Sequence, residues 1–294
     1  MSEELDRRGV IDVDGAILRY ACEGSGTPAL VIGSSIYYPR TFSRRLRERM
    51  RLAFVDTRHF AEPTGSVAPG DVSLNTYLAD IAQAQTQLGF DRVVLIGHSH
   101  HGNLALEYAK WHPERVSHVV LIGTPPVDAD ETVRAAKAYW KRNASEPRKR
   151  LLREQVAAFR AEQSVRLLPA QAYIAEYVAE GPKYWFNPHY DASPLWQGVP
   201  LDMGVMAVFR GFFAEGYELQ WDPEQLTAPV FLAMGRHDYA VPPTLWDEDR
   251  LARNGLAFRL FERSGHTPQL EEPEEFDRML LEWLELSAGS QPLS

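Results

Sequence analysis

The chain has 294 residues, 45% hydrophobic, and its 40 acidic and 31 basic residues give a net charge of -9, which argues against nucleic acid as a partner. No stretch approaches the roughly 18 apolar residues of a membrane span, and the charged N-terminal segment lacks the apolar region of a signal peptide. The single cysteine, Cys22, cannot form an internal disulfide, so we expect a cytoplasmic protein that binds no membrane.

The predicted elements alternate between strand and helix after an N-terminal hairpin, whose two short runs are joined by Asp14-Gly15. Six later runs rich in Val, Leu and Ile lack strict alternation, as strands buried on both faces do. These runs are Ala29–Ile32, Leu52–Val55, Val93–Ile96, Val116–Ile122, Val230–Met234 and Phe258–Phe261. Helical patterns lie between them at Thr41–Met50, Leu74–Leu88 and Asn103–Trp111. The alternation predicts an α/β fold with a mostly parallel central sheet flanked by helices.

The alternation stops between Asp128 and Leu219, where helical patterns dominate. They are Glu131–Arg142, Arg148–Gln163 and Ala170–Ala179. We therefore expect a helical insertion. It is rich in aromatic residues, most of which should pack its own small core while a few line an apolar pocket. After it the chain returns to the sheet and ends in an amphipathic helix that starts at Pro273, with residues 287–294 as a disordered tail.

The stretch LIGHSHHG places Ser99 among three histidines, between a buried run and a helical pattern. A serine becomes a nucleophile when a base removes its proton and a sharp turn lifts its oxygen above the sheet. The order of strand, turn and helix around Ser99 is the context that such a motif requires. The usual pattern is Gly-x-Ser-x-Gly, and here Gly97 fits, but His101 occupies the second glycine position and Gly102 follows one place late. An ordinary turn serine is the alternative.

Two partners for Ser99 follow later buried runs. Asp238 lies in the loop after Val230–Met234, and His266 lies in the loop after Phe258–Phe261. Since the carboxyl ends of parallel strands lie at one edge of a sheet, these three side chains should converge there, in the chain order expected for this architecture. Asp238 would orient His266, which would take the Ser99 proton and return it to the leaving group. The alternatives are a loop-capping acid and a surface histidine.

The chain resembles the α/β-hydrolase family over nearly its whole length. The stretches LIGHSHHGNLALEYAKWHPERV, LIGTPPV, APVFLAMGRHDYAVPP and SGHTPQLEEPEEF carry the likeness. Within the family the chain is most similar to capped proline-iminopeptidase-like and esterase or lactonase-like enzymes. The resemblance implies a core of residues 1–127 and 220–294, a helical cap of residues 128–219 inserted after the sixth strand, and no cofactor.

An oxyanion hole needs two donors aimed at the developing charge. One should be the backbone N–H of His100, and the other should come from the loop after Ala29–Ile32, where the family usually has His-Gly-x. Here the loop reads Gly33-Ser34-Ser35, which makes Ser35 the donor, or Ser34 after a shift of one place. The proline-iminopeptidase loop His-Gly-Gly-Pro-Gly is absent, which weakens that activity. We expect a substrate pocket lined by Ser34, Tyr37, Trp140, Trp185 and Phe209.

The histidines around Ser99 do not have the spacing of metal ligands. His98 and His100 are two residues apart and His101 adjoins, whereas ligand pairs on a helix are three or four apart. On a turn from strand to helix the three side chains should diverge. We expect His98 to pack beneath the loop, His100 to face the pocket and His101 to pack under the helix. The sequence therefore predicts no metal.

Three functions fit these residues. We favour a serine hydrolase acting through an acyl-enzyme on a small carboxylic ester or lactone with an apolar portion. An aminopeptidase or amidase would need a cap carboxylate for the substrate ammonium, for which Glu176, Glu215 and Glu218 are available. A ligand-binding or non-hydrolytic protein on the same fold is the third function. The expected partner is a small molecule, and the chain could act as a monomer or a homodimer.

Overall fold

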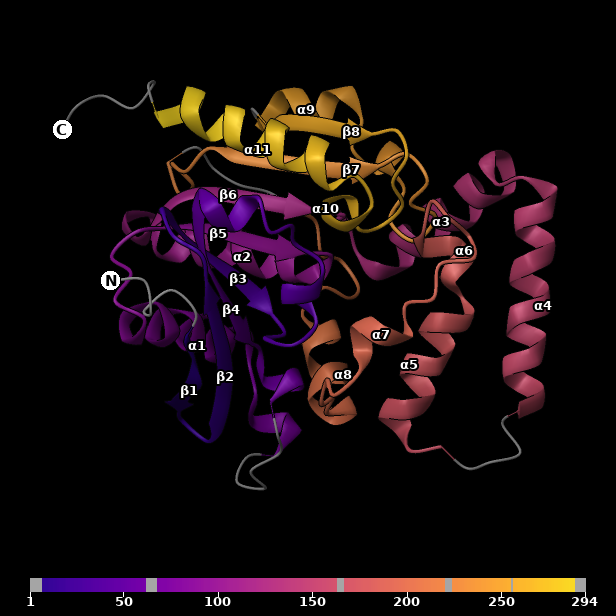
Figure 1. Ribbon diagram of the computed structural model, residues 1–294, viewed down its shortest axis with the longest axis horizontal. Helices are drawn as coiled ribbons and strands as arrows, with labels where there is room; N and C mark the ends of the chain where they lie inside the picture. The colour runs from indigo at the N-terminus through magenta and orange to yellow at the C-terminus, as the bar shows by residue number, and fades with distance from the viewer. Residues whose placement is uncertain (1–6, 62–67, 163–166, 220–223, 255, 289–294) are drawn as a thin grey trace.

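The computed structural model describes residues 7–61, 68–162, 167–219, 224–254 and 256–288 (Figure 1). These residues contain an eight-stranded sheet with the order β1-β2-β4-β3-β5-β6-β7-β8. The strands are β1 (Arg7–Val13), β2 (Ala16–Glu23), β3 (Thr27–Gly33), β4 (Met50–Asp56), β5 (Val93–His98), β6 (Val116–Ile122), β7 (Val230–Gly235) and β8 (Ala257–Phe261). The first two strands pair as an antiparallel hairpin and β2 is antiparallel to β4, while all other pairs are parallel. The mostly parallel sheet of the sequence prediction is confirmed.

Helices cover both faces of this sheet (Figure 1). Helices α1 (Leu74–Gln87) and α2 (His100–Trp111) pack together, and α2 contacts β5 and β6. On the other face, α11 (Pro273–Ala288) places Phe276 and Trp283 against Phe231 of β7. Two smaller helices, α9 (Glu248–Asn254) and α10 (Pro268–Glu271), flank β8 in the chain. None of the described helices has the length and apolar character to span a membrane.

The segment 41–50 is not the helix that its pattern predicts. It contains a 3-10 turn at Leu46–Glu48, which follows another at Tyr38–Arg40, and Met50 begins β4. The guanidinium of Arg47 accounts for the difference, because it donates at 2.7 Å to the backbone carbonyls of Pro39, Phe42 and Ser43. A regular helix would need carbonyls of this segment for its own N–H groups.

Between β6 and β7 the described chain forms six helices: α3 (Ala129–Asn143), α4 (Glu146–Glu162), α5 (Pro169–Ala179), α6 (Gly181–Tyr184), α7 (Ser193–Trp196) and α8 (Met203–Gly211). They gather at the edge of the sheet toward which the parallel strands point (Figure 1). The two ends of the segment lie side by side, because Val127 bridges to Glu218 and the Leu219 N–H donates to the Pro126 carbonyl at 2.7 Å. The chain therefore leaves the sheet and returns to it at the same place.

The C-terminal helix extends into the expected tail. Ser287 and Ala288 belong to α11, and the Ser287 hydroxyl donates to the Trp283 carbonyl at 2.6 Å. The same hydroxyl lies 3.0 Å from Nε2 of His118 in β6. These bonds attach the end of α11 to the sheet, so residues 287 and 288 are not part of a disordered tail. Residues 289–294 lie outside the described part of the chain.

Candidate active site

Ser99 forms a strained turn between β5 and α2. Its φ of 55° and ψ of -133° make it the one non-glycine residue with positive φ in the described chain. Such a conformation costs about 1–3 kcal/mol and persists only where neighbouring bonds hold it. Here the Ser99 N–H donates to the Ile122 carbonyl at 2.8 Å, and the Ser99 carbonyl accepts from the Gly102 N–H at 2.9 Å. The fold thus holds Ser99 in a sharp strand-to-helix turn.

Close backbone packing explains which positions of this turn must be glycine. A Cβ on Gly97 would lie 2.2 Å from the His101 carbonyl oxygen, and a Cβ on Gly102 would lie 1.9 Å from Oγ1 of Thr124, just after β6. Helix α2 therefore lies against the segment that follows β6 at Gly102. This geometry leaves room for a side chain at position 101, where the usual motif has its second glycine.

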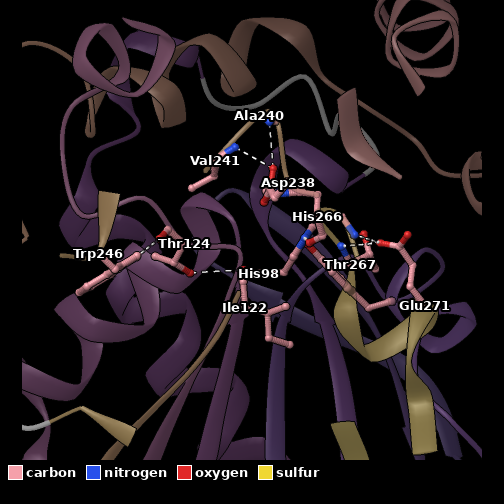
Figure 2. Close-up of polar contacts among 12 residues, drawn as sticks. His98, Ile122, Thr124, Asp238, Ala240, Val241, Trp246, His266, Thr267 and Glu271 are labelled. Atoms are coloured by element: carbon pink, nitrogen blue, oxygen red, sulfur yellow. Dashed lines mark hydrogen bonds and ion pairs between the residues drawn. The ribbon is translucent and has the colours of Figure 1, made fainter. Parts of the chain in front are cut away.

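The ring of His266 is held at Nδ1 by the carboxylate of Asp238 (Figure 2). Its Nδ1–H donates to Oδ2 of Asp238 at 2.6 Å. The other carboxylate oxygen of Asp238 accepts the N–H groups of Ala240 at 2.9 Å and Val241 at 2.7 Å, and the side chain is fully buried. Because Nδ1 carries the proton of the neutral ring, Nε2 of His266 is the nitrogen that can accept one.

Ser99 and His266 line the same cavity, which has a volume of about 430 Å³. Asp238 lies directly behind His266 in this arrangement. The structure therefore brings the three residues, which follow β5, β7 and β8, to the carboxyl-terminal edge of the sheet. A cavity of this size matches a small organic ligand.

The side chain of His98 lies beneath the loop that carries His266. Its Nε2 is 2.8 Å from the His266 carbonyl oxygen, and the two rings lie 4.5 Å apart (Figure 2). A carbonyl only accepts, so Nε2 of His98 must carry the proton. Burial lowers the pKa of His98 well below its usual range, so the ring is neutral. Its Nδ1 then accepts the hydroxyl proton of Tyr38, at 3.3 Å.

Further buried groups continue this chain of hydrogen bonds. The Tyr38 hydroxyl lies 3.5 Å from Nδ1 of His101, whose Nε2 lies 3.2 Å from Nε2 of His59. His59 Nδ1 in turn lies 2.8 Å from the Tyr77 hydroxyl. Burial lowers the pKa of His101 to about 3 and that of His59 well below its usual range, so both rings are neutral. One set of tautomers satisfies every link, with protons donated in one direction from Tyr77 to the His266 carbonyl.

These histidines thus act as hydrogen-bonding groups of the protein interior. No group of three His, Cys, Asp or Glu side chains in the described ranges is arranged to hold a metal ion. The Tyr38 and His59 contributions were not foreseen from the sequence. Neither residue is near Ser99 along the chain. The one indication in the sequence was the order of apolar strands, which predicts that the loops after them lie at the same edge of the sheet.

His100 begins helix α2, where the first N–H groups of a helix have no intrahelical acceptor. Its backbone N–H follows the strained turn directly, as an oxyanion donor should. The side chain lines the cavity, stacks on Phe213 with ring planes 4° apart, and lies with Nδ1 3.3 Å from Oδ1 of Asn103. Burial lowers the pKa of His100 to about 4, so the ring beside Ser99 is neutral.

The loop after β3 differs from the expected oxyanion loop. The Ser35 N–H donates to Oδ1 of Asp56 at 2.6 Å, so it is not directed at the cavity. Asp56 is the buried last residue of β4, and it also accepts from Nε of Arg19 at 3.1 Å. Because a buried carboxylate is costly without hydrogen-bond donors, Asp56 needs both of these bonds. The Ser34 hydroxyl accepts the N–H groups of Ile36 and Tyr37, both at 3.2 Å. Neither serine lines the cavity.

Of the five residues expected in the pocket, Tyr37 and Phe209 line the cavity, whereas Ser34, Trp140 and Trp185 do not. Trp185 is fully buried, and Trp140 packs edge-on against Tyr239. The wall also contains four tyrosines that the sequence analysis did not assign to it: Tyr38, Tyr173, Tyr177 and Tyr184. Two of these tyrosines could have been grouped from the sequence. Tyr173 and Tyr177 are four residues apart, so they share one face of α5.

Glu271 connects the loop of His266 to the helical insertion. Figure 2 shows its carboxylate beside Thr267. One of its carboxylate oxygens accepts the N–H groups of Gly265 and Thr267, at 2.8 and 3.3 Å, and the other accepts the Phe186 N–H at 2.6 Å. The His266 N–H also donates to the Tyr184 carbonyl at 2.6 Å. Burial raises the pKa of Glu271 to about 7, although its amide partners favour the carboxylate.

Comparison with known proteins agrees with this architecture. The family model for the alpha/beta hydrolase fold matches residues 26–273. A protein of Bacillus subtilis named AB hydrolase superfamily protein YclE is 34% identical over 286 residues, which are 96% of this chain and all of that one. A proline iminopeptidase of Heyndrickxia coagulans is 25% identical, with 91% of this chain and 95% of that one covered.

Solved structures show the same fold at low sequence identity. An alpha/beta fold family hydrolase from Bacillus anthracis superposes with a TM-score of 0.70 at 16% identity, covering 95% of this chain and 99% of that one. An esterase from Exiguobacterium antarcticum superposes with a TM-score of 0.66 at 19% identity, covering 95% of this chain and all of that one.

Proposed function

This chain belongs to the alpha/beta hydrolase fold family, and we propose that it is a serine hydrolase of small carboxylic esters or lactones. The observation that carries the proposal is the strained turn at Ser99, which opens on the same cavity as His266, whose ring is held by Asp238. We treat residues 128–219 as a cap over this cavity, since Tyr173, Tyr177, Tyr184 and other cap residues line it.

The proposed reaction has two acyl-transfer steps. Oγ of Ser99 attacks the acyl carbon while its proton passes to Nε2 of His266, and Asp238 stabilises the resulting imidazolium. The imidazolium then gives the proton to the departing alkoxide, which leaves an acyl-enzyme and an alcohol. Water attacks the acyl carbon as His266 takes its proton. Collapse of this second intermediate releases the acid, and the proton returns to Ser99.

The oxyanion of each intermediate needs two donors, and the His100 N–H is the first of them. The loop of residues 33–38 has to supply the second. Ser35 can do so only if its N–H leaves Asp56, to which it donates at 2.6 Å. The N–H groups of Ile36 and Tyr37 make longer bonds of 3.2 Å to a neutral hydroxyl, so they are freer to turn toward an oxyanion.

An ester or lactone fits the cavity better than a peptide with a free amino terminus. An aminopeptidase needs a carboxylate for the substrate ammonium, and no Asp or Glu is among the described residues that line the cavity. In particular, the cap residues Glu176, Glu215 and Glu218 are not part of its wall. The cavity instead contains Arg210, which would repel an ammonium group.

A substrate panel tests this function. Purified protein is assayed with p-nitrophenyl esters, aliphatic lactones and proline p-nitroanilide, and labelled with a fluorophosphonate. We expect hydrolysis of esters or lactones in preference to the anilide, and labelling at Ser99. Ser99→Ala should lower turnover by about 10⁴-fold or more while the protein stays folded.

Three results would contradict the proposal. Turnover close to wild type in Ser99→Ala would remove the nucleophile. Preference for the anilide would favour an aminopeptidase. Absence of both turnover and labelling would favour a ligand-binding protein on this fold.

A further inference from the structure

The cavity beside Ser99 has a single arginine among the described residues of its wall. Among the described residues of its wall, the other ionisable groups are histidines, tyrosines and Ser99, and Arg210 is the one arginine, lysine or carboxylate. Arg210 lies near the C-terminal end of α8, in the insertion. A guanidinium has five N–H donors in a planar fork, which suits a carboxylate held through two parallel hydrogen bonds.

Among the described residues, one hydrogen bond from these donors is found. Nη2 of Arg210 donates to the Tyr173 hydroxyl at 3.0 Å, and the guanidinium lies 5.0 Å from the centre of the Tyr173 ring. In the part of the chain that the structure describes, Arg210 forms no ion pair with an acidic side chain. Arg210 is exposed, and a guanidinium at a cavity wall can bind a carboxylate through two parallel charge-assisted hydrogen bonds.

The surroundings of Arg210 also favour an anionic group of modest size. Tyr173 and Tyr177 belong to the same wall, and phenols can donate to a carboxylate. The positive charge reaches the start of α2, because burial and then Arg210 both act to lower the pKa of His100. Arg210 is therefore electrostatically linked to the wall next to Ser99, within a cavity of about 430 Å³.

We propose that Arg210 binds a carboxylate carried by the substrate, so that the preferred substrates are small esters that also bear an ionised carboxyl group. This inference rests on the proposed hydrolase function. The other role available to Arg210 is to support Tyr173 within the cap. The two roles differ in their consequences, because support for the cap affects charged and neutral substrates alike.

Matched substrates separate these roles. The p-nitrophenyl monoester of glutaric acid carries a free carboxylate, and p-nitrophenyl pentanoate has the same acyl length without the charge. A second pair, the pentanoyl esters of p-hydroxybenzoate and of phenol, places the carboxylate on the leaving group. For the pair that fits, the wild-type kcat/KM should be higher for the anionic ester by about 10- to 100-fold, mainly through KM.

Variants of Arg210 should change this ratio. Arg210→Gln should lower the ratio of anionic to neutral kcat/KM by about 10- to 100-fold, and Arg210→Lys should retain part of it, since lysine keeps the charge without the fork. The control is Arg142→Gln, which removes an exposed arginine of α3 that does not line the cavity, and it should leave the ratio unchanged. An equal ratio in wild type and Arg210→Gln, or a wild-type preference for both neutral esters, would overturn the inference while leaving the hydrolase function intact.

A binding measurement keeps the inference testable if no ester is hydrolysed. Glutarate is titrated calorimetrically into Ser99→Ala and into the double variant Ser99→Ala/Arg210→Gln. Binding that weakens about 10-fold or more in the double variant would support the carboxylate site even if the proposed hydrolysis fails. Equal binding, or no binding to either protein, would overturn it.

Discussion

The side chain of His98 donates its Nε2–H to the backbone carbonyl of His266 at 2.8 Å. His98 is the last residue of β5 and precedes Ser99, so this bond connects the proposed nucleophile directly to the loop that carries the proposed base. The two proposed catalytic groups are therefore positioned against each other through a neutral, buried imidazole as well as through the sheet.

Replacing His98 should lower catalysis more than substrate binding. In His98→Ala the His266 carbonyl loses its donor and the loop can shift, and displacements of this kind cost up to about 10²-fold in turnover. We expect kcat to fall by about 10- to 100-fold with KM changed much less. Steady-state kinetics on a p-nitrophenyl ester measure both constants. His118→Ala, in which a buried histidine near the other end of the sheet is removed, should leave kcat unaltered. A kcat within twofold of wild type in folded His98→Ala would refute this positioning role.

Asp238→Asn should abolish most activity with little change in fold. The asparagine oxygen can still accept the N–H groups of Ala240 and Val241, which leaves its NH₂ group facing Nδ1 of His266. His266 would then carry its proton on Nε2 and could not act as a base, a change that costs about 10⁴-fold in serine proteases. Turnover and circular dichroism measure the two effects, with Asp191→Asn at an exposed turn as control. Retention of more than a tenth of wild-type turnover would rule out this orienting role.

Gly102→Ala should destabilise the protein, because the new methyl group would lie 1.9 Å from Oγ1 of Thr124. Overpacking of this kind costs about 1–3 kcal/mol of unfolding free energy. Gly211→Ala is the matched control, since a Cβ there meets nothing within 4 Å, and it should be neutral or stabilising. Urea denaturation measures both. The clash is the cause if adding Thr124→Ala recovers part of the loss, and it is not the cause if the double variant is as unstable as Gly102→Ala.

Glu271 should make stability fall as the pH rises toward neutrality. Its pKa is raised from 4.5 to about 7 in the folded protein, mainly by burial, so the folded state holds the proton more tightly than the unfolded state. The stabilising contribution is complete below pH 4.5 and is lost as the pH rises through 7. Relative to Glu271→Gln, which does not titrate, wild type should lose up to about 3 kcal/mol over this range.

Urea denaturation of wild type and Glu271→Gln from pH 4.5 to 8 measures this difference directly, over a range that spans both pKa values. Glu274→Gln, at an exposed position of α11, should show no such trend. A difference between wild type and Glu271→Gln that stays constant with pH would show that Glu271 titrates as it does in the unfolded chain.

Apart from the segment 41–50, the order of the main strands and helices of the core could be predicted from the sequence alone, as could the meeting of Ser99, Asp238 and His266. Local hydrophobic patterns determine the elements, and parallel strands bring the loops after β5, β7 and β8 to one edge whatever the details of packing. Only the tertiary structure decided where the Ser35 N–H points, because its acceptor, Asp56, is 21 residues away on another strand.

The same limit applies to the cap. Periodicity located the first three of its helices, α3, α4 and α5. Which aromatic side chains face the cavity depends on how each helix is rotated against the sheet, so Trp185 is buried elsewhere while Tyr173 and Tyr177 line the wall. The position of Arg210 in that wall and the attachment of the His266 loop to the cap through Glu271 are likewise contacts between distant segments. Patterns within a segment record which side chains are apolar, whereas the partners of buried polar groups are chosen only when the segments pack together.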